Sequence, residues 1–118
     1  MERQEFKTLI SGWIVSRLGT DAHAEGALRR FSDVYDQLHE GIVHFWFVKT
    51  DGTLRSAYGT LVMEIVKRHG GIPDDESKER SKRPELSGLV TYFDLEKDAW
   101  RCFKADSIQE IDLDYGVS

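Results

Sequence analysis

The chain has 118 residues, which is enough for one domain with a single hydrophobic core. Its 21 acidic and 16 basic residues give a net charge of −5, which argues against general binding to nucleic acids or anionic membranes but leaves room for a local basic patch. The single cysteine excludes an intrachain disulfide and a cysteine-based zinc site.

Two amphipathic helices are predicted in the first third of the chain. Apolar residues at helical spacing predict a helix over residues 3–18 that ends at Gly19. A second helical pattern covers residues 22–40, with Thr20 or Asp21 as its N-cap. We expect the two apolar stripes to pack against each other and a sheet; the alternative is that they form a dimerisation face.

From residue 42 the apolar period changes to two, which is typical of a strand. The two faces of this strand carry the apolar set Val43, Phe45 and Phe47 and the mixed set His44, Trp46 and Val48. Asp51-Gly52 predicts a tight hairpin turn, because glycine tolerates the positive φ that such turns need. The return strand covers about residues 54–61, and Gly59 within it predicts a bulge or a sharp bend.

The remainder of the chain contains further short elements. Residues 62–69 fit either a short helix or a strand, and the polar stretch 70–88 is expected to be a mobile loop. Strands are predicted at residues 89–95, 99–104 and 108–113. About five short strands after two helices indicate an α+β fold with a small, strongly bent antiparallel sheet or barrel.

The unit "VHFWFVKTDGTLRSAYGTL" and the hairpin "YFDLEKDAWRCFK" are the most distinctive motifs of the chain. Over roughly residues 28–113, they resemble a family of small bacterial and phage proteins described as SH3 β-barrel fold-containing proteins, distant relatives of the WYL domain. The helical spacing predicts an N-terminal helical segment at residues 1–41, and the resemblance implies an Sm-like or SH3-like barrel at residues 42–118. The first helix lies outside the resemblance.

The resemblance also implies a function class. WYL domains are regarded as ligand-sensing modules of bacterial regulators and defence systems, with nucleotides or nucleic acid as proposed ligands. A segment of those domains similar to "AWRCFKADSI" supplies an arginine near the proposed pocket, and the matching residue here is Arg101. This chain lacks the Trp-Tyr-Leu tripeptide, for which "HFWFV" is a loose substitute, and has no recognisable helix-turn-helix pattern.

Five side chains are candidates for binding a ligand. Arg55 and Arg101 lie on solvated strand faces with cross-strand ion pairs, or they form an anion site together with Lys104, since a guanidinium group matches the oxygens of a phosphate. Trp46 and Trp100 pack in the core, or they lie exposed and stack on bases or a peptide.

Other features favour ordinary structural roles. The four histidines have no metal-ligand spacing, so no metal or cofactor is expected. Turn chemistry accounts for the acidic residues of the second hairpin, and Cys102 is expected to be an inert, at least half-buried thiol. The basic run at residues 78–83 is a solvated loop or an arm that contacts an acidic partner or nucleic acid.

The sequence therefore favours a non-catalytic binding module whose barrel takes a nucleotide, a nucleic acid or another anionic ligand. The alternative is an adaptor for a protein partner or a homo-oligomer, with the N-terminal helices or a barrel edge as the interface. The first residues lack a signal-peptide core and no apolar run reaches membrane-spanning length, so the expected location is the cytoplasm, without membrane contact.

Overall fold

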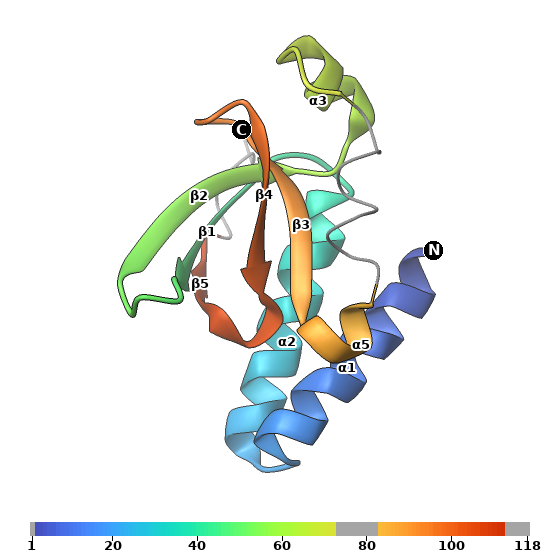
Figure 1. Cartoon of the computed structure of the whole chain (residues 1–118), viewed down its shortest axis with the longest axis vertical. Coiled ribbons are helices and arrows are strands. Elements are labelled where there is room, and N and C mark those ends of the chain that lie inside the picture. The colour runs from blue at the N-terminus through green and yellow to red at the C-terminus, as the bar shows by residue number, and fades with distance from the viewer. Residues whose placement is uncertain (1, 73–82, 113–118) are drawn as a thin grey trace.

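The computed structural model describes residues 2–72 and 83–112 (Figure 1). Its helices are α1 (Arg3–Leu18), α2 (Ala22–Leu38), α3 (Met63–Arg68), α5 (Pro84–Ser87) and the 3-10 helix η1 (Ala105–Ser107). Its strands are β1 (Val43–Val48), β2 (Leu54–Thr60), β3 (Leu89–Asp94), β4 (Ala99–Lys104) and β5 (Ile108–Ile111).

The two long helices begin where the sequence predicts. Gly19, with φ of 86°, follows α1, and the Asp21 side chain caps α2 by accepting from the Ala24 N–H at 3.0 Å. The second helix ends at Leu38, two residues earlier than predicted. Of the two structures proposed for residues 62–69, the short helix is present as α3.

The strands form one antiparallel sheet with the order β4-β3-β2-β1-β5. β2 pairs with β1 from Leu54 to Gly59 but with β3 only through Gly59 and Thr60. The two hairpins therefore diverge from a short shared junction, and β2 curves strongly between them (Figure 1). The α+β fold with five bent strands is confirmed, although the sheet is not closed within the described residues.

One hydrophobic cluster joins the helices to the sheet. It includes Ile10 and Ile14 of α1, Phe31 of α2, and Phe45, whose ring centroid lies 5.1 Å from that of Phe103. The apolar stripes of α1 and α2 thus pack against each other and the sheet, as the first interpretation expected. A smaller cluster joins Val66 of α3 to Phe93 of β3 and Trp100 of β4.

Gly59 does not form a bulge, contrary to the first of its two interpretations. The register between β1 and β2 is continuous through this residue, and the shift in register lies instead between β1 and β5, at Trp46 and Phe47. A Cβ atom at Gly59 would lie 2.6 Å from Cδ2 of Tyr92. The glycine is needed because the Tyr92 ring packs directly on the backbone of β2.

The predicted loop at residues 70–88 requires a correction at its C-terminal end. Residues 84–87 form helix α5, Pro84 is buried, and Gly88 has a φ of 65°. A Cβ atom at Gly88 would lie 2.3 Å from the Trp13 ring of α1, so this turn is packed tightly. Residues 73–82 of the predicted loop, and Leu113 at the end of the last predicted strand, lie outside the described residues.

Candidate functional site

β4 carries Arg101, and the register of β4 with β3 shows which residues share a face with it. Arg101 pairs with Tyr92, and Phe103 pairs with Val90, so all four side chains lie on the inner face of the sheet. Tyr92, Phe103 and Val90 are buried, but Arg101 is exposed. β4 is an edge strand of the described sheet. A side chain on its inner face can therefore reach solvent, because no further strand of the described sheet lies beside it.

A cavity of about 240 Å³ lies between the end of β1 and β4, and we call it the seam cavity. The four basic residues in its wall are Lys49, Arg55, Arg101 and Lys104. The structure therefore brings together three of the five predicted ligand-binding residues and adds Lys49, which the sequence analysis missed. Lys49 could have been noticed only as the last residue before the tight turn.

Arg55 is not a free donor, because it pairs with Asp94. Its Nη2 donates to Oδ2 of Asp94, which is fully buried, and the Tyr92 hydroxyl donates to the same oxygen at 3.4 Å. The other oxygen, Oδ1, accepts from the backbone N–H groups of Glu96 and Lys97 at 2.9 and 3.2 Å. Turn chemistry does account for Asp94, but the carboxylate also compensates the charge of Arg55.

This network also affects Tyr92. Burial, and then the neighbouring Asp94 carboxylate, raise the pKa of the Tyr92 phenol above its usual value. The phenol therefore stays protonated and serves as a hydrogen-bond donor. Arg55, Tyr92 and Asp94 thus form hydrogen bonds with one another, and this buried polar cluster is not an open ligand site.

Lys104 is also engaged by the protein. Its Nζ donates to the Ser87 carbonyl at 3.0 Å and lies 5.8 Å from the centroid of the Trp13 ring, so it holds α5 and α1 together. The remaining cations are Arg101, which has no ion pair in the described part of the chain, and Lys49, whose Nζ lies 4.0 Å from Oδ2 of the exposed Asp51. Arg101 and Lys49 are therefore the exposed cations in the wall of the seam cavity.

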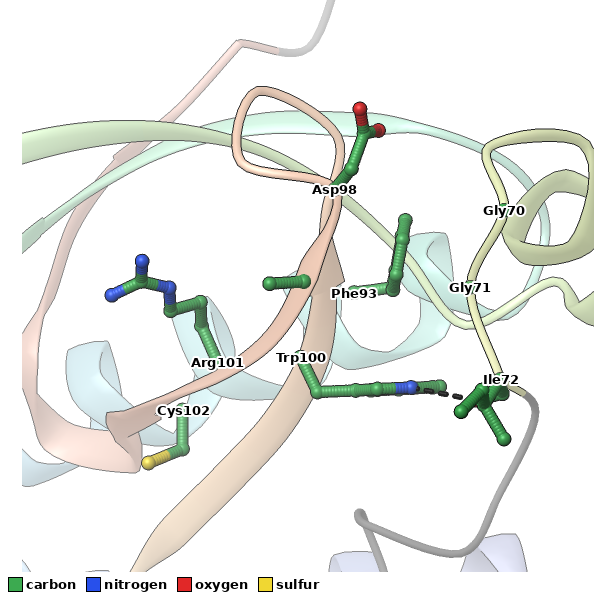
Figure 2. Close-up of a pocket in the computed structure, with 9 residues that line it drawn as sticks. Gly70, Gly71, Ile72, Phe93, Asp98, Trp100, Arg101 and Cys102 are labelled. Atoms are coloured by element: carbon green, nitrogen blue, oxygen red, sulfur yellow. Dashed lines mark hydrogen bonds between the residues drawn. The ribbon is translucent and has the colours of Figure 1, made fainter.

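A second cavity of about 680 Å³ lies beside the first, and we call it the tryptophan cavity (Figure 2). Its wall consists of residues 70–72, Phe93 and residues 98–102. Trp100 is only 6% exposed, and its Nε1 donates to the Ile72 carbonyl at 2.8 Å. Arg101 and Cys102 belong to the walls of both cavities. Sequence analysis missed residues 70–72 because no local pattern marks them.

The two predicted tryptophan candidates have different positions. Trp100 packs edge-on against Phe93, with ring centroids 5.5 Å apart, so core packing is confirmed while its indole also lines a cavity. Trp46 lies half-buried on the other face of β1, where its ring centroid is 4.3 Å from that of His44. Trp46 belongs to neither cavity wall, so the structure does not bring it to the arginines.

Other site types find little support among the residues that the structure describes. No group of three or more His, Cys, Asp or Glu residues there is arranged to hold a metal ion. Cys102 is half-buried, as predicted. None of the described helices combines the length and apolar character needed to cross a membrane.

The strongly bent five-stranded sheet and its helical cover define an Sm-like, SH3-like architecture. The profile of the WYL_2 family, described as an Sm-like SH3 beta-barrel fold, matches residues 31–109, from within α2 to β5. The chain therefore belongs to the WYL_2 family, and the predicted resemblance is confirmed. Neither the curated proteins nor the solved structures contain a match.

Proposed function

We propose that the protein is a non-catalytic binding module that takes an anionic ligand at the seam cavity. The supporting observation is the pair of exposed cations, Arg101 and Lys49, in the wall of one cavity of a chain whose net charge is −5. A guanidinium group offers paired donors that match phosphate or carboxylate oxygens, and an ammonium group adds a point charge. Nucleotides and short nucleic acids are therefore the ligand classes to test.

The surrounding residues hold these donors in place. The Arg55–Asp94 pair fixes Arg55 at the side of the cavity, where its Cζ lies 5.9 Å from the centroid of the Phe47 ring. Because Asp94 neutralises Arg55, this pair shapes the wall and adds little net charge. Recognition of an anion then depends mainly on Arg101.

Calorimetric titration of the full chain with inorganic phosphate, nucleotides and short single-stranded oligonucleotides tests the proposal. Arg101→Ala should weaken anion binding by about 1.5–3 kcal/mol, the range for a hydrogen bond to a charged group. Arg29→Ala is the matched control, because Arg29 is exposed on α2, which contributes no residue to the cavity. Absence of binding to every anion, or equal weakening by the two variants, would overturn the proposal.

The alternative function is an adaptor for a protein partner or a second copy of the chain. The sequence favoured this alternative through the apolar stripes of the two N-terminal helices. These stripes pack in the core, so they do not provide an exposed interface. The large apolar side chains that remain exposed in the described residues are Val15, Leu54, Ile72 and Leu86. Sedimentation velocity over a range of concentrations tests this alternative, which a concentration-dependent dimer would favour over the binding module.

A further inference from the structure

The two cavities meet at Arg101 and Cys102, and this adjacency determines what ligand would fit them. We propose that they hold one ligand, a phosphate monoester whose phosphate lies in the seam cavity and whose flat ring system lies in the tryptophan cavity. This inference rests on the proposed function, since it names the ligand class of the same site. A nucleoside 5′-monophosphate is the representative compound of that class.

The sizes of the cavities support a division of the ligand between them. Pockets that hold small organic molecules have volumes of roughly 300–1,000 Å³. The tryptophan cavity, at about 680 Å³, lies within that range, whereas the seam cavity, at about 240 Å³, lies below it. The seam cavity is thus suited to a compact charged group, and the bulk of the ligand must lie elsewhere.

The charges of the seam cavity indicate a dianion. Asp94 compensates Arg55, and the exposed Asp51 carboxylate lies 4.0 Å from the Lys49 ammonium. Lys104 keeps its positive charge, because the Ser87 carbonyl that it contacts is neutral, and Arg101 has no ion pair among the described residues. Arg101 and Lys104 therefore supply two positive charges that no carboxylate of the described residues compensates. A phosphate monoester carries a charge of about −1.5 to −2 at neutral pH, while a diester carries only one negative charge. Charge matching therefore favours a monoester over the diesters of a nucleic-acid backbone.

The tryptophan cavity provides apolar and polar surface for a flat ring. Phe93, Trp100 and Ile72 supply apolar wall, and Figure 2 shows the Ile72 side chain beside the edge of the Trp100 ring. The backbone at Gly71 packs closely on this wall, because a Cβ atom there would lie 2.6 Å from both Phe93 and Val66. The exposed Asp98 carboxylate lies at its rim, where Oδ1 is 3.1 Å from Nδ1 of His69 and Oδ2 can accept a hydrogen bond from a ring N–H group.

The direction of the Arg101 side chain fits this arrangement. In Figure 2 the guanidinium group extends away from Gly71 and Ile72, while Trp100 extends toward Ile72. Successive residues of a strand point to opposite faces, so Arg101 and Trp100 serve different parts of one bound molecule. The phosphate and the ring then lie on either side of the strand at Arg101.

Titration of the full chain with a nucleoside monophosphate, the corresponding nucleoside 3′,5′-cyclic phosphate and inorganic phosphate tests the inference. We expect the monophosphate to bind about tenfold more tightly than inorganic phosphate, because apolar contacts of the ring add to the binding energy. The cyclic compound keeps the same ring but is a diester with one negative charge. It should bind more weakly than the monophosphate.

Two exposed apolar residues provide a matched pair of variants. Ile72 is 63% exposed and lines the tryptophan cavity, while Leu54 is 62% exposed and lines neither cavity. Ile72→Ala should remove most of the advantage of the monophosphate and leave the affinity for inorganic phosphate unchanged. Leu54→Ala should change neither affinity, and Arg101→Ala should weaken both.

The outcomes separate this inference from the proposed function. Equal affinity for the monophosphate and inorganic phosphate would overturn the shared ligand while leaving an anion site at the seam cavity. Tighter binding of an oligonucleotide without a terminal phosphate would overturn the monoester and identify a nucleic acid as the ligand. Absence of binding to any of these anions would overturn both proposals.

Discussion

At the residue scale, Asp94 combines complete burial with four hydrogen-bond donors drawn from Arg55, Tyr92 and the turn after β3. Asp94→Asn keeps the size of the side chain but leaves the Arg55 charge uncompensated. We expect the free energy of unfolding to fall by about 3 kcal/mol, the lower end for a broken buried ion pair, because the Arg55 side chain keeps 23% of its exposure. Urea denaturation measures this change.

Asp33→Asn is the control for that experiment. Asp33 is exposed on α2, and no ion pair in the described residues involves it. Its substitution should change stability by no more than about 0.5 kcal/mol. Equal unfolding midpoints for the Asp94 and Asp33 variants would show that the buried pair contributes nothing to the fold.

Two glycines should respond to alanine with opposite signs. At Gly59 a new methyl group would lie 2.6 Å from Tyr92 and 3.3 Å from Leu38, so Gly59→Ala should cost about 1–3 kcal/mol through overpacking. At Gly12, inside α1, nothing lies within 4 Å of the new atom. Gly12→Ala should stabilise by about 0.5–1 kcal/mol, because alanine has the higher helix propensity. Thermal melts that shift in the same direction would contradict this.

His39 makes the stability of the protein depend on pH. Burial, and to a smaller extent Arg3, lower its pKa from the ordinary value of 6.5, and its buried Nε2 has no hydrogen-bond partner among the described residues. Protonation then favours the unfolded chain. The contribution of His39 to stability is complete above pH 6.5 and is lost as the pH falls below it.

The variant His39→Gln tests this dependence, because glutamine does not titrate. It also removes the edge-on contact of the imidazole with Tyr35, at 4.7 Å between centroids, so it should be less stable than the wild type above pH 6.5. The loss of stability on acidification just below pH 6.5 should nevertheless be smaller than in the wild type. Parallel denaturation curves at several pH values provide the comparison, and identical pH dependences would rule out His39 as the cause.

At the residue scale, the sequence identified Arg55, Arg101 and Lys104 but could not tell which of them is available. The partner of Arg55 lies 39 positions away, on a strand that meets β2 only through Gly59 and Thr60. Such a pairing depends on where the two hairpins diverge. No local pattern in the sequence reports that geometry, which is why Asp94 appeared to be only a turn residue.

At the element scale, apolar periodicity made most of the fold predictable. The segment that forms α5 has no such periodicity, so this helix was not predicted. The helices and both hairpins follow from apolar spacing, the Asp21 cap and the turn at Gly52, whose φ is 90°. The helix α5 has only four residues in a polar stretch. Its position depends on tertiary contacts with Trp13 and Lys104, which a reading of local composition cannot include.

Hydrogen exchange should reveal the order of this segment. The Gly88 N–H donates to Pro84 at 2.9 Å, and the Ala105 N–H donates to Gly88 at 2.8 Å, so both amides should exchange slowly. Trp13→Ala removes the ring against which Gly88 packs and should accelerate both amides. The Gly52 amide, in the distant turn, is the internal reference and should keep its rate. Fast exchange at Gly88 and Ala105 in the wild type would mean that α5 is not stably docked.

At the scale of the whole molecule, stability and binding are assigned to different residues. A single core joins α1 and α2 to the inner face of the sheet, and Phe45 lies fully buried within it, against Phe47, Tyr92 and Phe103. Arg101 lies on the same face of the sheet but at the last strand, where it reaches solvent. Removing the first side chain should therefore affect folding, and removing the second should affect binding.

The final prediction compares these two variants. Phe45→Ala should lower the free energy of unfolding by about 3–5 kcal/mol, as expected for a large buried side chain. Arg101→Ala should change it by no more than about 0.5 kcal/mol. Because a ligand that binds only the folded state stabilises it, added phosphate should raise the melting temperature of the wild type and of Phe45→Ala, but much less that of Arg101→Ala. Added chloride at equal ionic strength is the control for general salt effects. If Arg101→Ala unfolds the protein while Phe45→Ala is harmless, the buried and the exposed positions of this face have been assigned in reverse. If phosphate stabilises all three proteins equally, the anion binds somewhere other than at Arg101.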